Sequence, residues 1–372
     1  MNERFIPRDS NHINSEVNKD LRSSSPNLTS ITKGPRQSNF ELLRIIAMFL
    51  VLIVHADFLS LGAPSKMDFF NESFDAVNKT IVQSFSIICV NIFILISGWF
   101  GIKTTLKGFF NFIFQCLFWY ILIYAFEIAC NIRVISTIDI RKCFFFAPGP
   151  GWFVLSYIGL YILSPIMNLF SEHTSKKELG YVLCSFYGLQ TFAWLGGGVS
   201  FFENGYSTIS FLGLYLLGRY LKLYLNFEKP WLLYFVSYII IISLIYIAST
   251  ILSININLYA YNNPLVVAGA AFLILWASNM NIKTNKVINW ISKSAFAVYL
   301  FHCSPFTISY YTDFCKKLYN EYNGIEYITL LGGFIISVFF VSIIIDQFRV
   351  LMWNGIINYK SQIKNKKNLV SI

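Results

Sequence analysis

The sequence predicts an all-α protein, a polytopic membrane helical bundle of about ten transmembrane helices. Hydrophobic residues make up 55 % of the 372 residues and charged residues only 13 %, whereas an ordinary soluble domain carries roughly 25 % charged residues. The mean hydropathy is +0.56, and the apolar residues gather in long runs. A soluble fold could not bury this much apolar surface, so the composition excludes the soluble classes.

Ten apolar runs have about the length of a membrane span, which needs about 20 mostly apolar residues. The fourth run contains Pro165, and the fifth is short and ends in three glycines. These two are therefore the weakest of the set. In chain order, the expected spans are 40–60, 80–100, 108–130, 151–169, 180–197, 208–225, 231–253, 263–280, 288–308 and 327–349.

The chain divides into three parts. Residues 1–38 are polar, rich in Ser and Asn, and lack apolar periodicity, which predicts a disordered cytoplasmic N-terminal arm. The arm has no apolar core of a signal peptide, so we expect the first span to be retained. Residues 39–353 form the expected transmembrane domain, and residues 354–372 form a basic cytoplasmic tail.

The positions of the basic residues predict the orientation. Lys103 and Lys107 lie in one expected cytoplasmic loop, whereas the outside loops 198–207 and 254–262 contain no Lys or Arg. This bias favours cytoplasmic termini and an even number of spans, although the outside loop 131–150 is more basic than the rule prefers. The net charge of +10 is therefore read as a topology signal, and we expect no nucleic-acid partner.

The cysteine spacing and the lack of an internal repeat argue against three classes of protein: disulfide-rich, zinc-binding and inverted-repeat. The seven cysteines show no Cys-x-x-Cys and no paired spacing, so neither a disulfide framework nor a zinc site is predicted, and we expect no metal. No convincing internal repeat occurs, which leaves a transporter of inverted repeats without support.

The first span carries two ionisable residues that share a helix face. Arg44 and His55 are eleven residues apart in "ELLRIIAMFLVLIVHADF". At about 100° and 1.5 Å per residue they lie within about 20° of one stripe, about 16 Å apart along the axis. Arg44 can be read as an interfacial anchor, and His55 as a buried polar residue bonded to a neighbouring helix. Ionisable residues inside a span are usually functional, which favours a functional His55.

Other ionisable residues give weaker signals. His302 lies near the outer end of the ninth span, where Pro305 should loosen the backbone; structural anchoring and a functional role are both open. Glu127 lies near the outer end of the third span and could line a cavity. Lys103 and Lys107, four apart, are expected to share a helix face and could hold phosphates or act only as topology signals.

Several stretches together resemble the membrane-bound acyltransferase-3 family, the bacterial integral-membrane O-acyltransferases of surface polysaccharides. The first span with its Arg–(ten residues)–His spacing is similar to the opening of the family. The resemblance continues in "VNIFILISGWFGIK", "GPGWFVLSYIGLYILSPIMN", "LGLYLLGRYLKLY" and "SKSAFAVYLFHCSP". Together these stretches cover nearly the whole chain after residue 38.

The resemblance implies a ten-helix bundle with cytoplasmic termini in the cell membrane. It implies that an acyl-CoA, usually acetyl-CoA, is the donor and that a hydroxyl of a cell-surface or lipid-linked glycan is the acceptor. Arg44 and His55 match the family's Arg–His pair and are the expected catalytic residues. Lys103 and Lys107 fall where the family often has Arg-x-x-Arg, so with Arg44 they are the candidate CoA-binding residues. Lysine lacks the bidentate phosphate contacts of arginine, and the spacing here is four instead of three.

This chemistry suits a histidine. Acyl transfer needs a base that takes the hydroxyl proton during attack on the thioester, and His55 would be neutral in a desolvated site. The alternative is a transient acyl-histidine. Trp152 and Tyr157, with His302 and Glu127, are the candidate acceptor-binding residues.

A transporter or flippase for a lipid-linked sugar is the alternative function. In that reading His55 and Glu127 form a proton relay, and the substrate moves without acyl-CoA.

Overall fold

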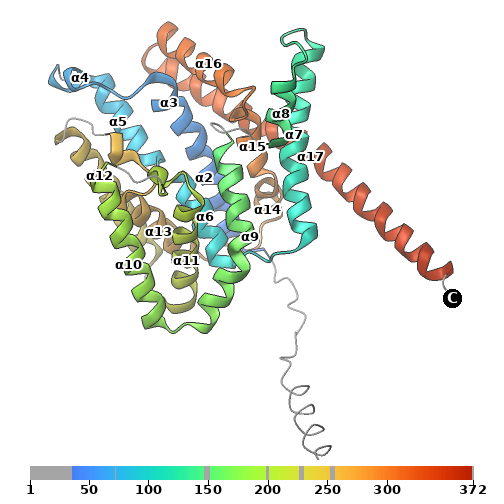
Figure 1. Ribbon diagram of the computed structural model, residues 1–372. Coiled ribbons are helices and arrows are strands. Elements are labelled where there is room, and N and C mark those ends of the chain that lie inside the picture. The colour runs from blue at the N-terminus through green and yellow to red at the C-terminus, as the bar shows by residue number, and fades with distance from the viewer. Residues whose placement is uncertain are drawn as a thin grey trace, which may run out of the picture. The chain divides into compact units, whose positions relative to one another are not determined.

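The computed structural model describes residues 36–71, 73–145, 151–197, 201–225, 230–251 and 256–370 (Figure 1). No strand occurs in these ranges, which confirms the all-α prediction. The predicted arm lies outside them as far as residue 35. The helices are α2 (Ser38–Ala56), α3 (Phe58–Leu61), α4 (Lys66–Phe70), α5 (Phe74–Ser86), α6 (Cys89–Phe100), α7 (Leu106–Ala129), α8 (Thr137–Phe145), α9 (Trp152–His173), α10 (Lys176–Leu195), η1 (Glu203–Gly205), α11 (Thr208–Tyr224), α12 (Trp231–Ile251), η2 (Ile256–Tyr259), α13 (Pro264–Asn279), α14 (Lys286–Lys293), α15 (Ala295–His302), α16 (Ile308–Glu321) and α17 (Gly324–Val370).

The chain is a multi-pass membrane protein. Within the described ranges, seven helical segments are long and apolar enough to cross a membrane: Ser38–Leu61, Phe74–Phe100, Leu106–Ala129, Trp152–His173, Trp231–Ile251, Asn257–Asn279 and Gly324–Lys360. Helices also occupy the three other expected spans. Of these, α10 has a charged first turn, α11 has 17 residues, and the ninth span breaks at Ser294 into α14 and α15. The total of about ten spans stays a prediction.

Helix α6 lies at the centre of the bundle, where it packs against α2, α11 and α13 (Figure 1). Its contact with α11 is a glycine seam. A Cβ added at Gly98 would lie 2.2 Å from the backbone oxygen of Tyr215, and one added at Gly218 would lie 2.5 Å from the backbone oxygen of Leu95. Glycine at both positions therefore lets the two backbones touch.

One end of the bundle gathers the start of α2 and the ends of α6 and α13. The ring of Phe40 packs on Trp99 and Phe100, with centroids 5.1 Å apart in both cases. The side chain of Asn39 donates a hydrogen bond of 2.8 Å to the backbone oxygen of Ala277. Helix α11 also ends here, and its Arg219 lies beside Gly101. We call this end of the bundle the basic end.

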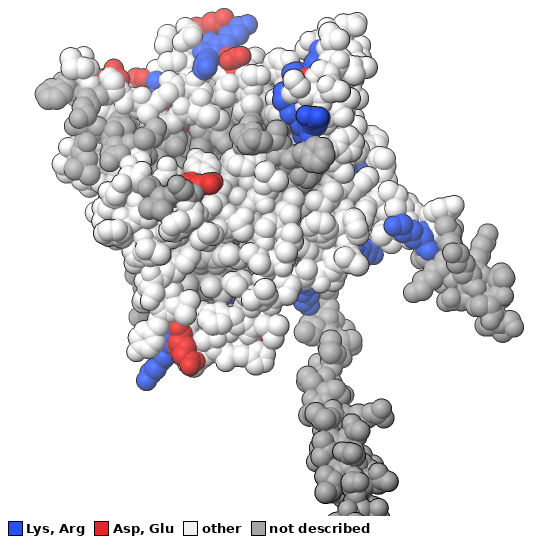
Figure 2. All heavy atoms as spheres, viewed as in Figure 1, with Lys and Arg blue, Asp and Glu red and all other residues white. Residues whose placement is uncertain are grey.

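Charged side chains are sparse across the middle of the molecule on the face drawn in Figure 2. Inside the bundle, Asp346 and Arg349 form a buried ion pair. Arg349 donates to both carboxylate oxygens of Asp346, at 2.8 and 2.6 Å, and the indole of Trp119 donates to the same carboxylate at 3.1 Å. The bond from Trp119 ties α7 to α17. Helix α17 then continues through the predicted tail as far as Val370.

Candidate active site

Arg44 and His55 both lie in α2, and the helix between them is uninterrupted. Their separation is therefore the predicted one, about 16 Å along the axis. The helix ends one residue after His55, because Asp57 adopts a non-helical conformation with φ −92° and ψ −107°. The histidine thus occupies the last turn of α2, next to the point where the helix is interrupted.

The partner of His55 is His302. Nδ1 of His55 lies 2.9 Å from Nε2 of His302, although the two residues are 247 positions apart in the chain. Nδ1 of His302 lies 2.5 Å from the backbone oxygen of Val298. The interpretation that His55 bonds to a neighbouring helix is therefore correct, and the neighbour is the other histidine singled out from the sequence.

The ring of His302 is held tightly against α2. It is 2 % exposed and packs against the rings of Tyr299 and Tyr311, with centroids 6.3 and 5.1 Å away. The hydroxyl of Tyr311 donates a 2.8 Å hydrogen bond to the backbone oxygen of Leu52, one turn before His55. Helix α15 ends at His302. Pro305 follows three residues later and prevents the helix from continuing.

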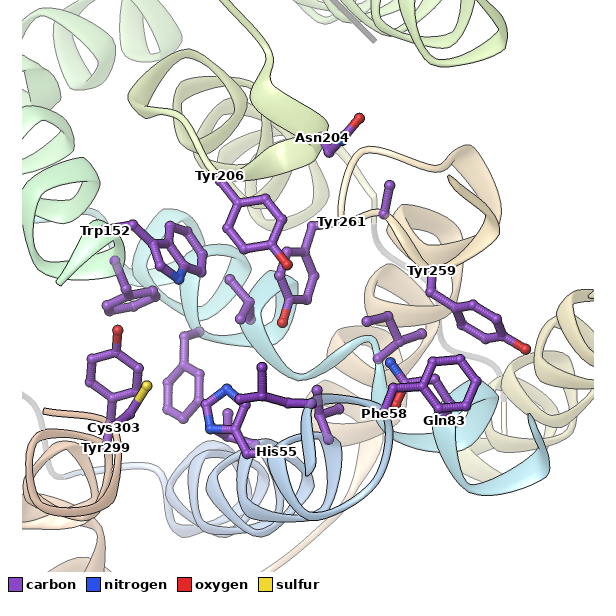
Figure 3. A pocket seen from close by; sticks show the side chains of 18 of the residues that line it. His55, Phe58, Gln83, Trp152, Asn204, Tyr206, Tyr259, Tyr261, Tyr299 and Cys303 are labelled. Atoms are coloured by element: carbon purple, nitrogen blue, oxygen red, sulfur yellow. The ribbon is translucent and has the colours of Figure 1, made fainter. Parts of the chain in front are cut away.

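His55 lines a cavity of about 640 Å³, a size typical of small-molecule sites. Figure 3 shows its ring at the edge of this space, opposite side chains from several other elements. Among the described residues, the lining consists of Met48, Val51, Val54, His55, Phe58, Leu59, Gln83, Ile87, Val90, Phe93, Trp152, Phe153, Asn204, Tyr206, Asn257, Tyr259, Ala260, Tyr261, Phe296, Tyr299, Cys303 and Ile308.

Aromatic rings form one wall of the cavity (Figure 3). Trp152 begins α9, and its ring lies 4.5 Å from that of Tyr206 and 6.0 Å from that of Tyr261. The wall includes the predicted acceptor residue Trp152 but not Tyr157, whose ring stacks behind that of Phe153 at 6.0 Å. Tyr157 therefore supports the wall from a second layer.

Two amide side chains add polar groups to the lining. Gln83 is 4 % exposed, and its Oε1 has no hydrogen-bond partner within the described ranges. Asn204 sits in a tight loop with φ +54°, between Glu203 and Gly205, which also have positive φ. A Cβ at Gly205 would lie 2.5 Å from that of Tyr261. Positive φ angles at residues other than glycine strain the backbone, and such strain is typical of functional loops. Here the loop brings Asn204 to the cavity.

Arg44 is anchored at the basic end and does not line the cavity. Its guanidinium donates a 2.5 Å hydrogen bond to Glu41, and the hydroxyl of Ser292 donates to the same carboxylate at 2.5 Å. The predicted stripe of Glu41, Arg44 and His55 is present, and the acid both pairs with the arginine and ties α2 to α14.

The expectation that Lys103 and Lys107 share a helix face is wrong. Gly101, with φ +71°, ends α6, and Thr105 caps the start of α7. Lys103 consequently lies in the loop and Lys107 in the first turn of α7, and both side chains are exposed. Neither lysine forms an ion pair within the part of the chain that the structure describes.

The sequence did not single out Arg219 or Lys222 as candidate site residues. The structure brings Arg219 beside Gly101, at the start of the α6–α7 loop, and Lys222 beside Trp99, in the last turn of α6. The guanidinium of Arg219 bonds to Ser171 and Glu172 at 3.1 Å, and the ammonium of Lys222 lies 5.1 Å from the centroid of the Trp99 ring. The basic end therefore carries more cationic groups than the sequence motifs alone indicated.

Glu127 lies away from the cavity lining. Its carboxylate accepts a 2.6 Å hydrogen bond from Arg133, which also reaches Asp139 at 3.4 Å. These contacts join α7 to the segment that leads into α8. The roles of Glu127 in acceptor binding and in a proton relay stay predictions.

The sequence did not single out three cavity residues that precede α13. Tyr259, Tyr261 and Asn257 come from one stretch between two spans, "NLYAYNNP", and its density of aromatic and amide side chains was the available signal. Within the described ranges, no three His, Cys, Asp or Glu side chains gather closely enough to hold a metal ion.

Comparison with known proteins identifies the family of the chain. No curated protein and no solved structure matches the chain. A family model described as an acyltransferase domain, acyltransferase 3, matches residues 37–347. The match includes both histidines, the cavity and the basic end. The chain therefore belongs to the acyltransferase 3 family and is a membrane acyltransferase.

Proposed function

We propose that this protein is an O-acyltransferase that moves an acyl group, acetyl in the first instance, from acyl-CoA to a hydroxyl of a cell-surface or lipid-linked glycan. The observation that supports the proposal is the placement of His55 on the wall of an aromatic-lined cavity, about 16 Å along the same helix from Arg44. The proposed location is the cell membrane, with both termini in the cytoplasm.

The basic end is the proposed donor side. CoA carries several negative charges, and clustered cations raise the local concentration of such a ligand. Lys103 and Lys107 are exposed without ion-pair partners in the described ranges, so they can take phosphates as point charges. Arg44 lies in α2, eleven residues before His55, and its hydrogen bond to Glu41 fixes the direction of its guanidinium.

The cavity is the proposed acceptor side. Sugars present apolar faces and many hydroxyls, which matches a wall of tyrosine and tryptophan rings with amides beside it. The unpaired Oε1 of Gln83 needs a hydrogen-bond donor, because a buried acceptor without one costs about 1–3 kcal/mol. A sugar hydroxyl supplies that donor, so Gln83 joins Trp152 as a proposed acceptor-binding residue.

In the proposed reaction His55 is the only base. The acceptor hydroxyl attacks the thioester carbonyl carbon while its proton passes to His55. The C–S bond then breaks, the acyl group remains on the acceptor oxygen as an ester, and the CoA thiolate takes the proton back from the imidazolium. The products are the acylated glycan and free CoA, with no oxidant or metal in the step.

The test uses bacterial membranes that contain the protein and radiolabelled acetyl-CoA. Label should enter the glycan fraction as esters that mild alkali releases. His55→Ala should abolish this transfer, whereas the matched control His173→Ala changes an exposed histidine at the end of α9 and should leave it intact. Equal labelling by His55→Ala, inserted at the wild-type level, would show that His55 is not the catalytic residue.

The same assay addresses the transport alternative. If the wild-type protein moves no label from acetyl-CoA to any glycan fraction, but vesicles containing it still translocate lipid-linked sugar, the protein is a flippase.

A further inference from the structure

We infer that His302 is a positioning residue that sets the tautomer of His55, so that Nε2 is the reactive nitrogen of the active site. This inference deepens the proposed function and rests on His55 being its catalytic residue. It holds whether His55 acts as a base or as a transient acyl carrier.

The backbone of α15 sets the tautomer of His302. A carbonyl oxygen only accepts hydrogen bonds, so Nδ1 of His302, 2.5 Å from the oxygen of Val298, carries a hydrogen. In a neutral imidazole the other nitrogen is then an acceptor. Nε2 of His302 therefore presents a lone pair, and it is directed at His55.

The tautomer of His302 in turn sets the tautomer of His55. Its Nδ1 lies 2.9 Å from that lone pair, so the favourable arrangement is Nδ1–H of His55 donating to Nε2 of His302. The Nε2 atom of His55 is left without hydrogen. Within the described ranges no side chain or backbone group hydrogen-bonds to it, and the ring lines the cavity, so its lone pair is available to substrate.

The surroundings keep both rings neutral and fixed. No carboxylate of the described residues hydrogen-bonds to either ring, and burying an unpaired charge is costly. His302 packs between Tyr299 and Tyr311, and Tyr311 is bonded to α2 at Leu52. The orienting group is therefore itself held against the helix that carries His55, as supporting groups of active sites are.

The opposite tautomer would disable the site. If Nδ1 of His55 carried the lone pair, Nε2 would carry hydrogen and could neither take a proton nor attack a thioester. His302 then plays the part that an orienting carboxylate plays beside a catalytic histidine, with a neutral ring in place of a buried charge.

Two amide substitutions separate positioning from structural support. The amide of Asn reaches the position of Nδ1, so His302→Asn keeps a donor for Val298 but loses the contact to His55. The longer Gln reaches the position of Nε2, so His302→Gln keeps an acceptor for Nδ1–H of His55. We expect His302→Asn to lower kcat by ~10²-fold or more with an unchanged KM for acceptor, and His302→Gln to keep most of the activity.

The tautomer is measured directly and without turnover. Nitrogen-15 NMR of histidine-labelled protein in detergent distinguishes protonated from unprotonated ring nitrogens, and the His55→Ala spectrum identifies the His55 signals. Wild-type and His302→Gln protein should show Nε2 unprotonated, and His302→Asn should show a mixture. An Nε2–H tautomer in the wild type overturns the inference, as does equal activity of the Asn and Gln variants.

This design separates the two proposals. If His55→Ala stays active, the proposed role of His55 fails whatever the spectrum shows. If His55→Ala is inactive but the His55 tautomer is the same in the wild type and His302→Asn, only the positioning role of His302 fails.

Discussion

From the glycine seam between α6 and α11 we predict how much Gly98→Ala destabilises the protein. The new Cβ would lie 2.2 Å from the oxygen of Tyr215, whereas ordinary contact begins at 3.4 Å, so the helices must separate by about 3.4 − 2.2 = 1.2 Å. Overpacking costs about 1–3 kcal/mol, and a backbone obstacle places this case near the upper value. Alanine in a helix regains about 1 kcal/mol relative to glycine. The net destabilisation is therefore about 2 kcal/mol.

Thermal unfolding in detergent measures this effect, with Gly188→Ala as the matched control. Gly188 lies in α10, and a Cβ there meets nothing within 4 Å, so this variant should be as stable as the wild type or more stable. Helix α6 also carries Val90 and Phe93 of the cavity wall, and a misplacement of about 1 Å can cost ~10²-fold in activity. A Tm for Gly98→Ala at or above that of the wild type would refute the packing argument.

Three further predictions concern stability. Arg349→Leu leaves Asp346 buried without its cation and should cost about 3–5 kcal/mol; unfolding measurements should show that replacing both residues by Leu costs less. Ser175→Ala removes the capping box of α10 and should lower the unfolding free energy by about 0.5–2 kcal/mol, seen as a lower Tm. Lys142 donates a hydrogen bond that lowers the pKa of Asp139, so this stabilisation is present above the unfolded pKa of about 3.9 and is lost as pH falls through the lower folded pKa. Asp139→Asn should reduce the fall in Tm between pH 5 and pH 3, and an unchanged slope would contradict the assignment.

The α6–α7 loop shows where local reasoning failed. A spacing of four residues predicts a shared face only if one helix contains both residues. Gly101 and the capping residue Thr105 end one helix and begin another, so Lys103 and Lys107 are independent groups. Both signals were present in the sequence, but Gly and Thr in a short loop also occur without a helix boundary.

The sequence by itself determined the features that depend on one helix or on composition. The apolar content required a membrane bundle, and the 3.6-residue period put Arg44 and His55 on one stripe of α2. The tertiary structure alone decided that His302, 247 positions away in the chain, meets His55 and that side chains from separate loops and helices enclose one cavity. Helical periodicity shows which face a residue occupies, but the neighbour of that face is set by the packing of whole helices, through contacts such as the glycine seam.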